Sequence, residues 1–74
     1  MTLSEKIVEI LAGELGPAAS SLFSAQCAAQ NKDPAKITKD DLDGIAKGIY
    51  EDIRPLVGDD HADRAIKKIL TLKQ

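Results

Sequence analysis

The chain has no tryptophan, and its only aromatic residues are Phe23 and Tyr50. A folded core must therefore be built almost entirely from leucine, isoleucine, valine and alanine. The chain also has a single cysteine, Cys27, which has no partner for an internal disulfide. Because small secreted domains usually depend on several disulfides, we expect a reducing compartment and a cytoplasmic location.

Long apolar runs and blocks of one charge are missing as well. No window approaches the roughly eighteen apolar residues of a membrane span, and acidic residues interrupt the N-terminal stretch where a signal peptide would be apolar. The twelve acidic and ten basic side chains are interspersed and give a net charge of −2. The densest basic group, Lys67, Lys68 and Lys73, is typical of a helix end rather than of a phosphate-binding face. We therefore expect neither a membrane nor a nucleic acid as partner.

The bulk composition is that of a soluble globular chain, with 43% hydrophobic and 30% charged residues. Its 74 residues predict one helical domain covering 1–74. A chain of this size buries only about 60–65% of the surface that its unfolded form exposes, so its stability margin should be thin.

The stretch 38–55 has the longest apolar period and predicts the central helix. Its apolar side chains recur at steps of three and four residues, which places them on one face: Leu42, Ile45, Ile49, Ile53 and Leu56. Thr38 and Asp41 form a helix-capping pattern at its start. Pro55 should end or kink this helix, because an interior proline costs about 3 kcal/mol.

Three further helices follow from the same kind of signal. Thr2 and Glu5 form a capping box for a first helix that Gly16 ends, and Pro17 fits the first turn of a second helix. Asp59 or Asp60 should cap a fourth. No segment alternates with the period of a strand, so the sequence predicts an all-α, compact bundle of four short helices. Its predicted core is Ile7, Ile10, Leu11, Leu15, Leu22, Phe23, Leu42, Ile45, Ile49, Ile53, Ile66, Ile69 and Leu70, with Ala62 and Ala65 also facing inward.

Two features point to close packing or to a partner. Residues 18–30 contain no charged side chain, so the second helix is either sandwiched between others or presents an apolar flank to a partner. Gly44 and Gly48 each cost a helix about 1 kcal/mol, which favours a compensating close approach, either within the chain or in a homodimer. The candidate interaction surface is therefore Ala18, Ala25, Ala29, Gly44 and Gly48.

The acidic run around Gly44 resembles a calcium loop only in part. With Gly44 at the sixth loop position, Asp41 and Asp43 take the third and fifth, but Lys39 falls at the first and Tyr50 at the twelfth. A cation at the first position opposes calcium binding, so we interpret the run as an acidic helix start. No metal site is expected there.

No residue pattern indicates catalysis. Cys27 lies in an apolar helix without a basic neighbour and is interpreted as a small core residue. His61 stands among Asp59, Asp60 and Asp63, which we interpret as a solvated helix start rather than a metal site. Ser20, Ser21 and Ser24 have no adjacent base or glycine elbow. We expect no catalytic, cofactor-binding or metal-binding residue.

Two families share general features with the chain. Its size, acidity and helix number are similar to those of acyl carrier proteins, but the nearest approach to their Asp-Ser-Leu motif, Ser20-Ser21-Leu22, lacks the aspartate. The segments LGPAASSLFSAQC, ITKDDLDGIAKGI and AIKKIL resemble small helical modules at the ends of prokaryotic signalling and regulatory proteins. That resemblance implies a helical interaction module without catalytic residues.

The sequence therefore favours a small non-enzymatic protein-interaction module that acts through a helical surface. Its partner would be another protein or a second copy of the chain in a homodimer. The alternative is a carrier or small-ligand protein, with a pocket between the helices and Cys27 or a serine near its mouth.

Overall fold

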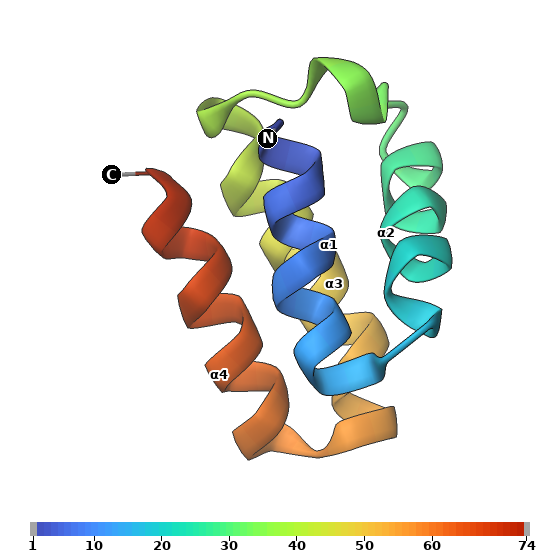
Figure 1. The fold of residues 1–74 in the computed structure, drawn as a ribbon, viewed down its shortest axis with the longest axis vertical. Coiled ribbons are helices and arrows are strands. Elements are labelled where there is room, and N and C mark those ends of the chain that lie inside the picture. Colours follow the sequence, from blue (N-terminus) through green and yellow to red (C-terminus); the bar gives the residue numbers. More distant parts are fainter. Residues whose placement is uncertain (1, 74) are drawn as a thin grey trace.

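Four α-helices dominate residues 2–73, which are the residues that the computed structural model describes (Figure 1). Helix α1 spans Leu3–Leu15, α2 Ala18–Ala29, α3 Leu42–Val57 and α4 Asp59–Leu70. Short 3-10 turns occur at Pro34–Lys36, Lys39–Asp41 and Thr71–Lys73. No strand is present in this part of the chain. The predicted all-α bundle of four helices is confirmed.

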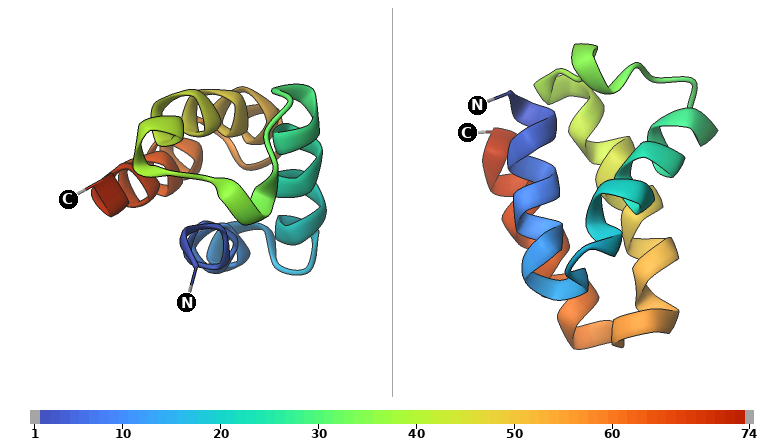
Figure 2. Two further views of the ribbon diagram at one scale, coloured as in Figure 1. Left: turned by 90° about the horizontal axis from the view of Figure 1, so that it is seen from above. Right: turned by 45° about the vertical axis from the view of Figure 1, so that its right-hand side comes forward.

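The helices pack in a cycle in which each makes its main contacts with two others. Extensive contacts join α1 to α2, α2 to α3, α3 to α4, and α4 back to α1. Viewed from above, the four helices surround a common centre (Figure 2). The principal extents of 29 × 24 × 20 Å are those of a compact globule.

Capping side chains set the predicted starts of two helical segments. The Thr2 hydroxyl accepts a hydrogen bond from the Glu5 N–H at 3.2 Å, and the Glu5 carboxylate accepts one from the Thr2 N–H at 3.2 Å. Both halves of this capping box satisfy amides that have no partner within the helix. At the second site, the Asp41 carboxylate accepts a hydrogen bond from the Thr38 N–H at 3.0 Å. The turn that follows Thr38 is a 3-10 turn, and α3 itself begins at Leu42.

The connection between α3 and α4 differs from the prediction in two ways. α3 does not end at Pro55 but continues to Val57. Pro55 lies in the last turn, with only two helical residues after it, and its missing N–H removes a single helical hydrogen bond. Gly58, with a φ of 88°, ends the helix in a conformation that favours glycine. Gly58 also occupies the cap position of α4. Asp59 and Asp60 therefore lie in the first turn of α4 rather than capping it, and there they complement the helix dipole.

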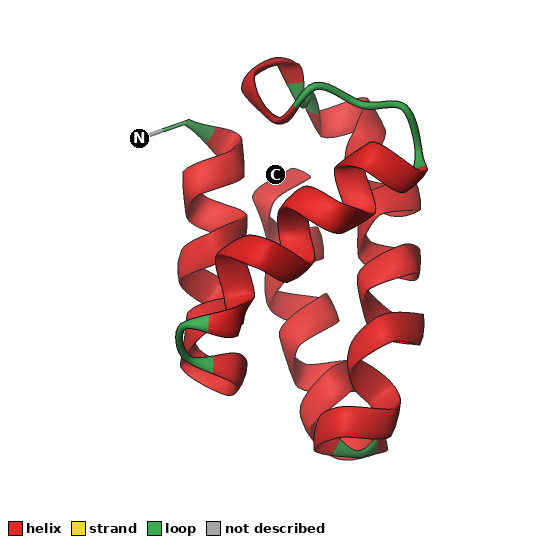
Figure 3. Ribbon diagram, turned by 90° about the vertical axis from the view of Figure 1, so that its right-hand side faces the viewer, coloured by secondary structure: helices red, strands yellow, loops and turns green. Residues whose placement is uncertain are grey.

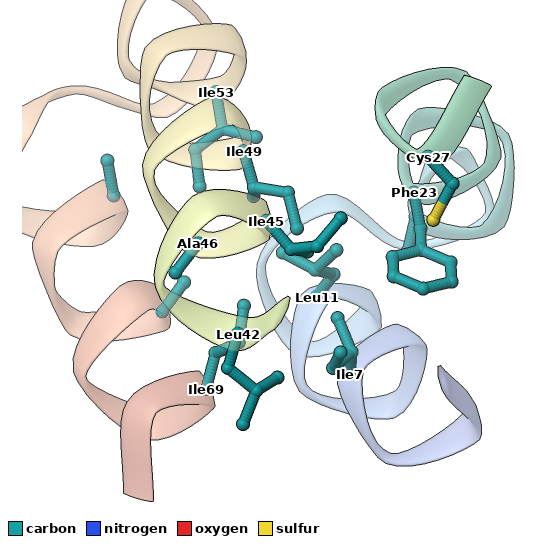
Figure 4. Packing of buried hydrophobic residues seen from close by; sticks show 13 residues of the cluster. Ile7, Leu11, Phe23, Cys27, Leu42, Ile45, Ala46, Ile49, Ile53 and Ile69 are labelled. Atoms are coloured by element: carbon teal, nitrogen blue, oxygen red, sulfur yellow. The ribbon is translucent and has the colours of Figure 1, made fainter. Parts of the chain in front are cut away.

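The core consists of small and aliphatic side chains from all four helices around a single phenylalanine. Helix α3 contributes more of it than any other helix, as its apolar period predicts. Figure 4 shows its isoleucines directed toward Leu11 of α1, with Phe23 and Cys27 of α2 facing the same region. The fully buried residues are Ile7, Leu11, Ala19, Phe23, Cys27, Leu42, Ile45, Ala46, Ile49, Ile53, Ala62, Ala65 and Ile69.

The remaining predicted core residues lie at the margin of this cluster. They are partly buried and pack against it: Ile10, Leu15, Leu22, Ile66 and Leu70. Leu56, which the apolar period places on the buried face of α3, is 69% exposed. It follows Pro55 in the last turn of α3, at an end of the bundle (Figure 1). The apolar period therefore continues one turn beyond the part of α3 that the core covers.

Candidate interaction surfaces

One side of α2 is exposed and carries no charge. In Figure 3, α2 is the helix nearest the viewer and crosses obliquely in front of the others. We define its outer face as the exposed residues Ala18, Ser21, Ala25, Ala28 and Ala29. Three of these, Ala18, Ala25 and Ala29, belong to the predicted interaction surface.

The opposite side of α2 is buried against α1 and α3. Its buried residues are Ala19, Phe23, Gln26 and Cys27. The sequence left open whether α2 is sandwiched between other helices or presents an uncharged flank. The structure shows the second arrangement, with α2 covered on one side and an uncharged flank exposed on the other.

Gly44 and Gly48 lie beneath the side chains of Gln26, within α2, and Gln30, which directly follows α2. A β-carbon at Gly48 would clash with the carboxamide of Gln26 and lie 2.8 Å from the Gln30 Nε2. A β-carbon at Gly44 would lie 3.2 Å from the Gln30 Oε1. The two glycines therefore provide the room for glutamine side chains at the contact between α2 and α3, which is a role within the chain.

These glutamines form a hydrogen-bonded chain across the contact. Gln26 donates to the Asp52 carboxylate at 2.8 Å, and Gln30 donates to the Gln26 side-chain oxygen at 2.6 Å and to the Gly44 carbonyl at 3.0 Å. Gln26 is 9% exposed and is the one buried polar residue in the core of the described chain. Burying an amide without hydrogen-bond partners costs free energy. Here both the nitrogen and the oxygen of the Gln26 side chain have a partner.

A groove of about 480 Å³ runs between α1 and α2 beside the outer face of α2. Glu5, Val8 and Glu9 of α1 line one wall, and Ser20, Phe23 and Ser24 of α2 line the other. The Ser4 hydroxyl donates a hydrogen bond to the Pro34 carbonyl, which fixes the 3-10 turn at one end of the groove. The groove thus combines a partly apolar lining with two carboxylates and several hydroxyls.

A second groove, of about 400 Å³, has a mixed lining. It runs along α1 beside the C-terminal end of α4 and is lined by Lys6, Glu9, Ile10, Gly13, Lys68 and Leu72. Because charges of both signs lie along it, it has no single electrostatic preference.

Cys27 is buried in the core, as predicted. Burial raises the pKa of its thiol, and the negative charges of Asp33 and Asp41 raise it further. The thiol therefore stays protonated near neutral pH and is a poor nucleophile. It lines neither of the two grooves.

His61 contacts a carboxylate of another helix rather than those of its own. Its Nδ1 lies 3.0 Å from the Glu14 Oε2 and links α4 to α1. The His61 side chain is 53% exposed and that of Glu14 13%. Two of the neighbouring aspartates form ion pairs with other residues: Asp59 with Arg54 at 3.3 Å and Asp63 with Lys67 at 2.9 Å.

The acidic residues before Gly44 are likewise used in pairs. Asp41 forms an ion pair with Lys32 at 3.0 Å, in addition to accepting the capping hydrogen bond from the Thr38 N–H. Asp43 forms an ion pair with Lys73 at 2.9 Å. Across residues 2–73 no group of three or more histidine, cysteine or acidic side chains is placed to hold a metal ion.

Comparison with protein-family models, curated proteins and solved structures gives no significant match for this chain. In the described part of the chain, no helix is both long and apolar enough to cross a bilayer. The exposed surfaces are therefore the basis for any functional proposal.

Proposed function

We propose that this protein is a non-enzymatic interaction module whose binding surface is the outer face of α2, working in a reducing compartment such as the cytoplasm. One observation carries the proposal: this face is exposed yet uncharged. The exposed sides of the other helices carry charges throughout, as with Asp43, Lys47, Glu51 and Arg54 on α3. The outer face of α2 is thus the helical surface that loses least hydration when a partner covers it.

Small side chains suit such a contact for two further reasons. Alanine loses no side-chain entropy when it is covered, and serine loses little. Both also let the backbone of a facing helix approach closely. Self-association, with two copies of α2 packed against each other, is the simplest form of the module, because it needs no second protein.

Gly44 and Gly48 contribute to this surface indirectly. They let Gln26 and Gln30 pack down against α3, which holds α2 with its outer face directed away from the bundle. The resemblance to helical modules of regulatory proteins supports the same class of function.

Sedimentation across a hundredfold concentration range tests self-association. We expect a concentration-dependent dimer for the unmodified chain and a monomer for Ala25→Glu, which places a charge on the outer face of α2. Ala12→Glu, at an exposed site on α1, is the matched control and should dimerise like the unmodified chain. A monomer at every concentration would rule out the homodimer.

Heterologous binding is tested with the same pair of variants. Proteins captured by the unmodified chain and by Ala12→Glu, but lost with Ala25→Glu, would support the module. If Ala25→Glu retained every captured protein and every self-contact, the outer face of α2 would not be the binding surface.

A small-ligand carrier is the second candidate, and the groove between α1 and α2 favours it. Ser20 and Ser24 line that groove, so a hydroxyl is available at its mouth as this function requires. The test is the intact mass of protein isolated from its native source. An added group on Ser20 or Ser24 would support a carrier, and an unmodified mass, with no ligand released on denaturation, would exclude it.

A further inference from the structure

The groove between α1 and α2 has two walls of different chemistry. The α1 wall presents the carboxylates of Glu5 and Glu9, whereas the α2 wall presents the hydroxyls of Ser20 and Ser24. Between them lie Val8, which is partly exposed, and Phe23, which is almost fully buried beneath the surface. A segment lying in this groove would therefore meet negative charge on one side, neutral hydrogen-bonding groups on the other, and an apolar strip between.

No basic residue lines this groove, although Glu9 also borders the second groove, where Lys6 and Lys68 lie. Glu5 and Glu9 are four residues apart on a helix and so lie on the same side, where their like charges repel each other. Hydrogen bonds from the backbone and hydroxyl of Thr2 lower the pKa of Glu5, which keeps its carboxylate charged at neutral pH. A cation placed between the two carboxylates would remove the repulsion.

We propose that this groove binds a basic, amphipathic segment of a partner protein. An aliphatic side chain of the segment packs on Val8 and Pro34, and a neighbouring lysine or arginine lies between Glu5 and Glu9. Polar groups of the segment face Ser20 and Ser24. The proposal rests on the proposed interaction function and adds the chemistry of the partner.

The lining favours this occupant over a bare metal ion. The groove is partly apolar, and the described chain has no cluster of three acidic, histidine or cysteine side chains to bind a metal. A long basic side chain satisfies both parts of the lining, because its methylene stem packs on apolar surface while its charged head reaches a carboxylate.

Two synthetic peptides test the proposal. The first has leucines and lysines spaced to form an amphipathic helix on an alanine background, and the second replaces each lysine by glutamate. Each is titrated into isotopically labelled protein while backbone amide resonances are recorded. We expect the lysine peptide to shift the resonances of Val8, Ser20 and Ser24, and the glutamate peptide to leave them in place.

A pair of charge-reversal variants ties this binding to the groove. Glu9→Lys should weaken the affinity for the lysine peptide by about two- to tenfold, since it removes an exposed ion pair and adds a repulsion. Glu51→Lys makes the same change in net charge at an exposed site on α3 and should alter the affinity less than twofold.

The other outcomes would overturn the proposal. These are equal binding of the two peptides, shifts centred away from the groove, equal effects of both variants, or no binding at all. Failure here is separate from failure of the outer face of α2, because Ala25→Glu tests that face by self-association and capture without using either peptide.

Discussion

The carboxamide of Gln26 occupies the space beside Gly48 in which the β-carbon of any other residue would lie. This contact explains a glycine in the middle of α3, the helix with the largest share of the core. Gln26 is held there by its hydrogen bonds to Asp52 and Gln30, so the glutamine cannot move aside without losing them. Gly48 therefore lowers helix propensity but makes room for a satisfied polar contact between α2 and α3.

Replacing Gly48 by alanine should destabilise the protein despite alanine's better helix propensity. The propensity gain is about 1 kcal/mol, whereas displacing Gln26 costs about 1 kcal/mol per hydrogen bond together with the strain of overpacking. We expect a net loss of roughly 1–2 kcal/mol in the free energy of unfolding, measured by urea denaturation.

Gly13→Ala is the matched control. Gly13 lies within α1, and a β-carbon there meets nothing within 4 Å. This substitution should therefore stabilise the protein by about 0.5–1 kcal/mol. In a Gln26→Ala background the clash with Gln26 is absent and only the contact with the Gln30 Nε2 at 2.8 Å remains, so Gly48→Ala should become clearly less destabilising. An equal effect of Gly48→Ala in both backgrounds would show that Gln26 is not the cause.

Ile49→Asp should abolish folding. Ile49 is fully buried near the middle of α3, so aspartate there would place an unpaired charge in the core. We expect loss of the helical circular-dichroism signal and of a cooperative thermal transition, since the cost exceeds about 4 kcal/mol and the margin of a small domain is thin.

Lys47→Asp introduces the same residue two positions away, at an exposed site of α3. It should retain a cooperative transition close to that of the unmodified chain. If both variants unfolded, the effect would come from aspartate in this helix rather than from burial. A folded Ile49→Asp variant would contradict the position of α3 in the bundle.

Acid should destabilise the protein in part through its two capping carboxylates. Hydrogen bonds from Thr2 lower the pKa of Glu5 from its ordinary value of 4.5, and those from Thr38, with Lys32, lower that of Asp41 from 3.8. A carboxylate with a lowered pKa in the folded state adds stability above its unfolded pKa, and that stability is lost as the pH falls through the folded value. The urea midpoint should therefore fall as the pH drops below about 4.5.

The double variant Glu5→Gln, Asp41→Asn isolates this contribution. Glutamine and asparagine keep similar shapes but cannot titrate, so the urea midpoint of the variant should fall less steeply with acid than that of the unmodified chain. Parallel profiles for the two proteins would assign the acid sensitivity to other carboxylates.

The helices and most of the core were predictable because the capping residues and the apolar periodicity of each segment indicate the same helices that the packed core requires. The Thr2 capping box and the apolar period of α3 as far as Ile53 appear in the structure as expected, whereas Thr38 caps a 3-10 turn that precedes α3 and Leu56 is exposed. Pro55 was expected to end or kink α3 and does not end it, because a proline within the last turn removes a single helical hydrogen bond. Gly58, three residues later, was the effective stop signal.

The contact of Gln26 was not predicted, since a glutamine in a helix is usually exposed and α2 is apolar around most of its circumference. A signal was nevertheless present. Gln26 and Gln30 are spaced four apart, as are Gly44 and Gly48, so long polar side chains on one helix match gaps on another. Recognising this match requires knowing that α2 packs on α3, which neither helix specifies alone.

The cycle of helix contacts also bears on the order in which the chain assembles. Helices α1 and α2 form one hairpin and α3 and α4 a second, so most packing joins segments that are neighbours along the chain. Such topologies close short loops first and fold quickly, within microseconds to milliseconds. During synthesis, the inner side of the first hairpin, with Ile7, Leu11 and Phe23, stays uncovered until α3 has emerged. The isoleucine face of α3 thus covers the first hairpin, and α4 completes the core when its buried residues pack against α3.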